Sequence, residues 1–274
     1  MEIDAVLEVE AGDPQIAIDF LVANVNLSKS RLKDLMNKGG VWRVDASNNR
    51  QRIRRAMTDI FVGDQIEIFY DDRLLALKPL KATLLEDAGQ YSVWNKPFGM
   101  PLNGSDWGDF HSFCRAVEMA FNPAREIFWL SALDYQATGL LILAHTRKAA
   151  LAFADQLSVD GFEATARLHY RADVQGDYIG GESLDEPLDS ASAVTQVKKV
   201  RYDKRPDRTI VDVWPQTGRT DQVVRHLAQA GFPVIGDERY ADHEAGEGLR
   251  LRLVEMVFQC PVSGEQKHYS LVNE

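Results

Sequence analysis

Residues 131–145 read SALDYQATGLLILAH, and the rest of the chain is organised around this stretch. Asp134 follows one apolar run, 127–130, and precedes a second, 140–144. The residues between the two runs favour a turn, so the pattern predicts a strand, a tight loop and a second strand. Asp is a favoured turn residue, so the local pattern alone leaves two alternatives: a carboxylate that caps the turn and a carboxylate that acts.

Length and composition are those of a globular protein. The 274 residues are 45% hydrophobic and 26% charged, enough for one large domain or two smaller ones. No apolar run approaches the ~20 residues that span a membrane, and the N-terminus lacks a basic region followed by an apolar one. Two cysteines are too few for a disulfide framework. We therefore expect no membrane association and a cytoplasmic location.

Metal binding is not indicated. The six histidines show no close ligand spacing, and there is no Cys-x-x-Cys motif. The sequence therefore predicts no metal site.

Charge is distributed unevenly along the chain. The net charge is −10, which argues against nonspecific nucleic-acid binding by the whole protein. Residues 29–55, however, hold nine basic and only two acidic side chains. A solvated helix face is the simpler interpretation, but the one-signed excess favours RNA or DNA phosphate contacts. The residues expected to make them are Lys29, Arg31, Lys33, Lys38, Arg43, Arg50, Arg52, Arg54 and Arg55.

The N-terminal part predicts two helices and two strands. The helices are expected over 13–24, capped by Asp13, and over 29–38; the strands over 41–44 and 65–70. This arrangement resembles the small S4-type RNA-binding module. The matching residues are Ser30-Arg31-Leu32-Lys33, Gly39-Gly40-Val41 and Val62-Gly63-Asp64-Gln65-Ile66-Glu67-Ile68. The resemblance implies a small α/β S4-like domain over 1–75, followed by a linker over 76–89.

The remainder, 90–274, is rich in strands. We expect an α+β domain with a mostly antiparallel, mixed sheet and flanking helices. Strands are predicted over 91–94, 162–174, 194–200, 209–214 and 249–258, and helices over 111–120, 147–157 and 222–230. Thr220 and Asp221 are placed to cap the last helix.

Three side chains of this domain are candidates for chemistry. Asp134 offers a carboxylate, Arg219 lies in a turn at a helix start, and Tyr170 falls on the apolar face of its strand. A buried carboxylate needs a cation to stay ionised, and an aromatic ring can stack on a base. A turn aspartate, a surface arginine and a core tyrosine are the alternatives, and spacing does not show that the three meet.

The same domain resembles the RluA-type family of RNA pseudouridine synthases over nearly its full length. Five ordered matches carry the resemblance: Asn95-Lys96-Pro97-Phe98-Gly99; Leu133-Asp134 with Thr138-Gly139-Leu140-Leu141; Tyr170-x-Ala172-x-Val174-x-Gly176; Thr217-Gly218-Arg219-Thr220-x-Gln222 with His226-Leu227 and Gly236-Asp237-x-x-Tyr240; and Pro261 with Gly264-Glu265. The resemblance implies that Asp134 is the nucleophile or general base, Arg219 its ion-pair partner, and Tyr170 the ring that stacks on a flipped uridine. It also implies an enzyme without cofactor or metal, and Lys96 joins the expected RNA-binding residues.

The chain departs from the family pattern at four places, one of which is Cys260-Pro261 where the family has His-Pro. Ser131-Ala132 stands where the family has His-Arg, and Asp221 where it has His. The helix arginine of the family is Val224 here, with Arg225 displaced by one position. Because helical residues rotate by about 100° per position, Arg225 is not expected to point where the family arginine does.

Three functions compete at this stage. The first is isomerisation of uridine to pseudouridine in structured RNA, with ribosomal RNA as the expected partner and a monomer as the expected state. The second is a catalytically impaired member that acts as an RNA-binding or ribosome-assembly factor, which the losses at Ala132 and Asp221 favour. The third, a carboxylate-based hydrolase of a small nucleoside, leaves the basic segment unexplained.

Overall fold

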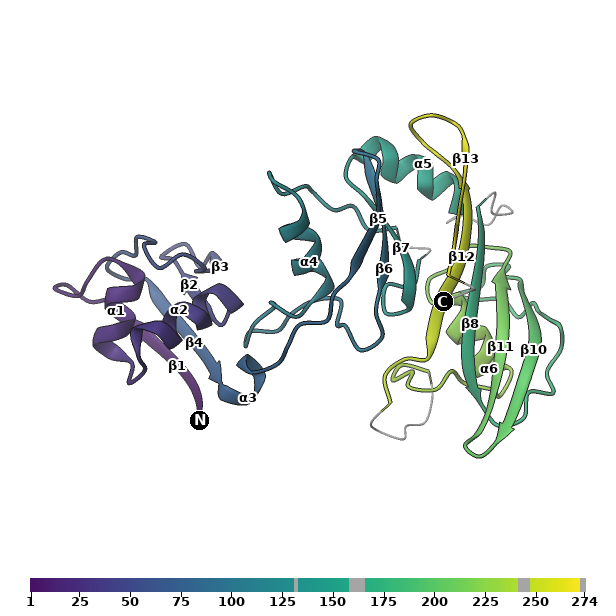
Figure 1. Cartoon of the computed structure of the whole chain (residues 1–274), viewed down its shortest axis with the longest axis horizontal. Coiled ribbons are helices and arrows are strands. Elements are labelled where there is room, and N and C mark those ends of the chain that lie inside the picture. The colour runs from purple at the N-terminus through teal and green to yellow at the C-terminus, as the bar shows by residue number, and fades with distance from the viewer. Residues whose placement is uncertain (131–132, 158–165, 241–246, 272–274) are drawn as a thin grey trace. The chain divides into compact units, whose positions relative to one another are not determined.

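The computed structural model describes residues 1–130, 133–157, 166–240 and 247–271. The chain divides into two compact units (Figure 1). The first combines residues 1–80 with 100–122, and the second combines 81–99 with the chain from 123 onward. The expected division at 75–90 therefore differs from the structure in one main respect: the chain returns to the first unit over 100–122.

The first unit is a four-stranded sheet with helices. The strand order is β1-β4-β2-β3. The elements are β1 (Glu2–Glu8), α1 (Ala17–Asn24), α2 (Lys29–Lys38), β2 (Val41–Val44), β3 (Arg50–Arg52), β4 (Gln65–Asp71), α3 (Asp72–Leu75) and α4 (Phe113–Ala120). Strand β1, which the sequence patterns did not indicate, pairs antiparallel with β4 along its whole length.

Capping explains where the helices of the first unit begin. Ser28 caps α2 by accepting a hydrogen bond from the backbone N–H of Arg31 at 3.3 Å. Helix α1 begins four residues later than predicted, at Ala17. The expected cap, Asp13, accepts instead from the backbone N–H of Glu10 at 2.8 Å and so closes the preceding turn.

The second unit is built on one nine-stranded sheet. Its main strand order is β5-β6-β7-β12-β8-β11-β10-β9, and β13 pairs with β12. The elements are β5 (Thr83–Asp87), β6 (Tyr91–Lys96), β7 (Thr138–Ala144), α5 (Arg147–Leu157), β8 (Arg167–Gln175), β9 (Ser183–Leu184), β10 (Thr195–Lys204), β11 (Asp207–Pro215), α6 (Gln222–Gln229), β12 (Leu251–Gln259) and β13 (Gln266–Ser270). Only the pairing of β7 with β12 is parallel among the described strands. The predicted α+β class with a mostly antiparallel, mixed sheet is confirmed.

Two expectations for this unit were wrong and one lies outside the described residues. The stretch 83–87, expected within a linker, is strand β5 and pairs with β6. The apolar run 127–130 forms no strand; Phe128 makes only an isolated bridge to Ala144. The beginning of the strand predicted over 162–174 lies outside the described residues, which resume at 166.

The core of the second unit lies where the apolar faces of β7, β8, β11 and β12 meet the helices. Strand β7 is buried along its whole length, and β8 alternates buried and partly exposed residues. Helix α5 packs on β7, and α6 packs on β10 and β11. Within the described part of the chain, no helix is long and apolar enough to cross a bilayer.

Gly139 permits the parallel contact at the start of β7. Its φ is +83°, and a Cβ atom there would lie 2.3 Å from the carbonyl oxygen of Leu253 on β12. Any side chain would therefore meet both an unfavourable backbone conformation and a backbone clash. Gly139 thus allows the loop that carries Asp134 to run directly into the sheet.

We predict that Gly139→Ala destabilises the protein more than Gly89→Ala does. Gly89 has a similar φ of +75°, but nothing lies within 4 Å of its virtual Cβ. Gly89→Ala should cost about 1–2 kcal/mol of unfolding free energy for the left-handed backbone alone. Gly139→Ala should cost roughly 1–3 kcal/mol more, because Leu253 must move. Urea denaturation measures both, and equal losses would show that the contact with β12 is not tight.

Candidate active site

Asp134 lies in the loop that enters β7. Its Oδ1 accepts a hydrogen bond from the backbone N–H of Gln136 at 2.9 Å, and its carbonyl oxygen accepts from Ala137 at 3.1 Å. The aspartate therefore does close the turn, as its local pattern suggested. Its second carboxylate oxygen, Oδ2, faces a guanidinium instead of the turn.

That guanidinium belongs to Arg239. Its Nη2 lies 3.4 Å from Oδ2 of Asp134, whose side chain is only 9% exposed. The same guanidinium contacts Asp221, with Nη1 2.7 Å from Oδ1, and Asp237, with Nε 3.5 Å from Oδ1. One cation is therefore shared by three carboxylates that come from three different loops.

The balance of these charges decides the acidity of Asp134. Burial raises the pKa of the Asp134 carboxyl above its ordinary value, since desolvation penalises the charged form. The positive charge of Arg239 opposes this rise in pKa, and the negative charge of Asp221 adds to it. Arg239 therefore keeps the carboxylate available as a base, and Asp221 works against ionisation.

Asp221 plays a different part from the expected one. It occupies the N-cap position of α6 with φ +54°, but its side chain makes no capping hydrogen bond. The carboxylate instead accepts from the hydroxyl of Tyr240 at 3.2 Å and contacts Arg239. The prediction that Asp221 caps the helix was wrong, because this side chain is directed to the arginine shared with Asp134.

The turn before α6 is held by Gln222 and not by Asp221. The Oε1 atom of Gln222 accepts from the Thr217 hydroxyl at 2.9 Å and from the Arg219 backbone N–H at 3.1 Å. Its Nε2 donates to Val194 and Thr195 at 2.9 Å each. This buried amide therefore fixes the segment that carries Arg219.

The three candidates for chemistry share one pocket. Asp134, Tyr170 and Arg219 line it together with Asp221 and Gln222. Tyr170, on β8, is only 3% exposed. Burial, followed by the negative charge of Asp134, raises the pKa of its phenol well above the ordinary value. Tyr170 is therefore a neutral ring beside the carboxylate.

The expected ion pair between Arg219 and Asp134 is replaced by the pair between Arg239 and Asp134. The guanidinium of Arg219 donates to the carbonyl oxygen of Ser192, with Nε at 3.2 Å and Nη2 at 3.1 Å. Arg225, the displaced helix arginine, binds Asp189 through two hydrogen bonds of 2.7 and 2.8 Å. The position before it, Val224, is buried. Residues 131 and 132, another departure from the family pattern, lie outside the described residues.

Lys96 lies inside the second unit and not on its surface. It is only 3% exposed, and its ammonium group donates to the carbonyl oxygen of Gln136 at 3.4 Å. Burial lowers the pKa of Lys96 to about 8, and the charge of Asp134 opposes that shift. Lys96, which is expected to bind RNA, is thus a buried cation near the loop of Asp134, and its contact with RNA stays a prediction.

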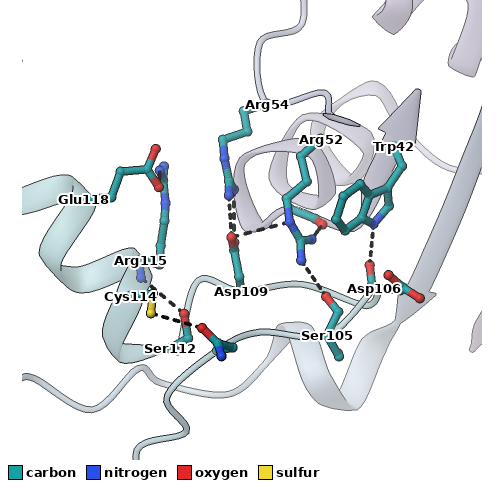
Figure 2. A network of polar contacts seen from close by, with 12 residues as sticks. Trp42, Arg52, Arg54, Ser105, Asp106, Asp109, Ser112, Cys114, Arg115 and Glu118 are labelled. Carbon is teal, nitrogen blue, oxygen red and sulfur yellow. Dashed lines mark hydrogen bonds and ion pairs between the residues drawn. The ribbon is translucent and has the colours of Figure 1, made fainter. Parts of the chain in front are cut away.

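The basic segment 29–55 is neutralised to a large degree within the first unit. Four of its members contact carboxylates of the first unit: Lys29 with Asp19 at 3.0 Å, Arg31 with Asp72 at 3.6 Å, Lys38 with Asp34 at 2.9 Å and Arg43 with Asp64 at 2.6 Å. Arg50 contacts Asp106. Arg52 and Arg54 contact Asp109 (Figure 2). Lys33 and Arg55 are exposed, and within the described chain neither has a carboxylate at ion-pair distance.

Arg239 is the site residue that the sequence patterns missed. It occupies an unassigned position in the Gly236-Asp237-x-x-Tyr240 stretch, where nothing marks it as functional. The sequence did contain one signal for Arg239. An acid, Asp221, stands where the family has His, and Arg239 is an arginine in the next matching stretch. Among the described residues, no group of three or more His, Cys, Asp or Glu side chains is arranged to hold a metal ion.

Comparisons with known proteins agree with this geometry. The sequence pattern of the family described as RNA pseudouridylate synthase matches residues 90–229. The chain is 26% identical to ribosomal large subunit pseudouridine synthase C of Haemophilus ducreyi, covering 90% of this chain and 85% of that one. Identity to the protein of the same name from Escherichia coli is 25%, covering 97% and 91%. The solved structure of human RNA pseudouridylate synthase domain containing 1 shares the fold, with a TM-score of 0.52 at 16% identity over 72% of this chain and 86% of that one.

We predict that Lys96→Met removes a pH dependence of stability. Between about pH 8 and its ordinary pKa of 10.5, Lys96 binds a proton in the unfolded chain that it has released in the folded one. The unfolding free energy should therefore rise with pH in this window because of Lys96. Denaturant unfolding of both proteins from pH 7 to 10.5 tests this. The quantity to compare is the unfolding free energy of the wild type minus that of Lys96→Met at each pH. If this difference stays constant or falls as the pH rises, Lys96 does not lose its proton on burial.

Proposed function

The chain belongs to the RNA pseudouridylate synthase family, and from this premise we propose that it isomerises a uridine of structured ribosomal RNA, with Asp134 acting at the chemical step. The observation that carries the proposal is the pocket shared by Asp134, Tyr170 and Arg219. The names of the relatives from Haemophilus ducreyi and Escherichia coli support large-subunit ribosomal RNA as the substrate class.

The reaction conserves all atoms. The bond between N1 of uracil and C1′ of ribose breaks, the base rotates, and a new bond forms between C5 and C1′. The proton on C5 leaves, and N1 gains a proton, so nothing is oxidised, reduced or hydrolysed. Asp134 can serve by attacking the sugar or by taking a proton from it, and both paths need the ionised carboxylate.

The neighbours of Asp134 supply what either path requires. Arg239 favours the ionised carboxylate, and its contact at 3.4 Å orients Oδ2. The hydrogen bond from the Gln136 N–H at 2.9 Å fixes the other oxygen. Tyr170 offers an uncharged ring beside the carboxylate, on which an extruded uracil can stack. The target nucleotide must leave its stack to reach these groups.

The first unit supplies the expected contacts to the RNA backbone. Lys33 and Arg55 are exposed and have no ion-pair partner among the described residues, so they are the cations most available to phosphates. The other members of the basic segment must exchange an internal carboxylate for a phosphate. The impaired RNA-binding factor is not favoured as an alternative, because the pocket retains the carboxylate of Asp134 and the buried Tyr170, and Arg239 pairs with that carboxylate.

We predict that Asp134→Asn lowers uridine conversion by at least about 10²-fold while RNA affinity stays within a few-fold of wild type. Loss of the carboxylate removes the nucleophile or base but no phosphate contact. Asp185→Asn, on an exposed loop of the same unit, is the matched control and should keep full activity. Pseudouridine mapping of ribosomal RNA in cells that carry each variant gives the readout. Full conversion by Asp134→Asn would remove Asp134 from the mechanism.

We also predict opposite pH shifts for the two neighbours of Asp134. Asp221→Asn removes a negative charge, so the pKa of Asp134 should fall and the acidic limb of the rate profile should move to lower pH. Arg239→Gln removes the opposing positive charge, so that limb should move to higher pH, with a rate loss of about tenfold or more from misorientation.

Single-turnover rates measured from pH 4 to 8 separate these shifts from misfolding. Damage to the fold lowers the rate, but it does not move the acidic limb to lower pH in Asp221→Asn and to higher pH in Arg239→Gln. Shifts of the same sign in both variants would contradict the shared-arginine arrangement.

A further inference from the structure

The face of the first unit formed by Trp42, Arg50, Arg52 and Arg54, here called the arginine face, is covered by residues 105–109. Figure 2 shows Trp42, Arg52 and Arg54 against Ser105, Asp106 and Asp109. The arginines come from β3 and the residues just after it, and Trp42 from β2. The covering residues, here called the acidic loop, are Ser-Asp-Trp-Gly-Asp. They lie more than 50 positions away in the sequence and belong to the same unit.

The arginine face is organised around a stacked tryptophan. The guanidinium carbons of Arg50 and Arg52 each lie 4.0 Å from the centre of the Trp42 ring. The indole N–H of Trp42 donates to the carbonyl oxygen of Asp106 at 3.0 Å. Two cations on one aromatic ring form a charged, planar platform, and such surfaces bind nucleic-acid backbones and unstacked bases.

The acidic loop places its carboxylates where phosphates would bind. The Nη1 atom of Arg50 lies 2.8 Å from Oδ1 of Asp106. Arg54 donates to both carboxylate oxygens of Asp109, and the Nε atom of Arg52 lies 3.5 Å from one of them. A two-pronged contact from arginine fits a carboxylate and a phosphate equally well. The two aspartates therefore imitate two phosphates of a polyanion.

The contacts of the loop are of a kind that a polyanion can replace. Arg50 and Asp106 keep side-chain exposures of 36% and 48%, and ion pairs this open contribute little each. The two-pronged pair of Arg54 with Asp109 is less exposed and is the strongest single contact of the loop. The backbone of the loop is also held by a hydrogen bond from Asp109 N–H to the Lys38 carbonyl oxygen at 3.0 Å and by one from Nη2 of Arg52 to the Ser105 carbonyl oxygen at 2.8 Å. Trp107 adds an edge contact to Phe69 with ring centres 5.7 Å apart. The loop is thus attached by several separate polar contacts, and a phosphate oxygen can replace those that the arginines make.

We propose that the acidic loop is an internal competitor that covers an RNA phosphate-binding surface, and that RNA binds the arginine face by displacing it. The inference rests on the proposed RNA substrate. It adds to that proposal the place where RNA first docks on the first unit and the condition for docking. RNA with closely spaced phosphates replaces both aspartates together, whereas an isolated anion replaces only one.

The first test removes the competitor. In an Asp134→Asn background, which prevents turnover, Asp106→Asn with Asp109→Asn should bind a uridine-containing RNA hairpin about three- to tenfold more tightly than the control. The control is Glu8→Gln with Asp59→Asn, which changes the net charge of the same unit equally. Both control residues are exposed and form no ion pair within the described chain. Equal affinity of the two double variants would overturn the inference, and weaker binding by the loop variant would assign the loop to RNA binding itself.

The second test needs no variant of the loop, so it decides the matter even where the double variant fails to fold. Hydrogen–deuterium exchange on the Asp134→Asn protein should show loss of protection at the Asp109 amide when the hairpin is added. Unchanged or increased protection there, with RNA bound, would show that the loop is a permanent clamp. If no variant binds the RNA hairpin, the proposed RNA function fails together with this inference, whereas binding without loop release overturns the inference alone.

Discussion

The parallel pairing of β7 with β12 is the constraint on which the site depends. It brings the start of β7 beside Leu253, and β12 in turn pairs with β8, which carries Tyr170. The loop of Asp134 runs directly into β7, so it enters the sheet one strand away from the strand of Tyr170, with β12 between them. Because Gly139 has no side chain, nothing separates β7 from β12 at this point. Backbone packing between β7 and β12 therefore positions Asp134, and the ion pair with Arg239 then orients its carboxylate.

At this site one arginine is shared by three carboxylates. Arg239 contacts Asp134, Asp221 and Asp237, and burial raises the pKa of Asp134. The family pattern has a helix arginine where this chain has the buried Val224, and Arg225 binds Asp189 instead. The cation for Asp134 comes from a loop beyond α6.

Periodicity and turn chemistry were sufficient to predict most helices and strands of the second unit and the turn that carries Asp134. The alternating pattern of β8 places Tyr170 inward, and the turn at Asp134 follows from local preference. Arg239 could not be foreseen, because its contact with Asp134 spans 105 positions and no local pattern encodes it. The same limit applies to the basic segment. Counting charges between 29 and 55 omits Asp64, Asp106 and Asp109, which lie outside that window and neutralise four of its arginines.

The acidic loop also decides which residues form the first unit. Residues 100–122 are flanked on both sides by the second unit yet belong to the first. Removal of residues 1–80 would leave two aspartates and Trp107 without the surface that they contact. A cut of the chain near residue 80 would therefore not divide it into two self-contained halves, because residues 100–122 supply part of the first unit from within the second half of the sequence.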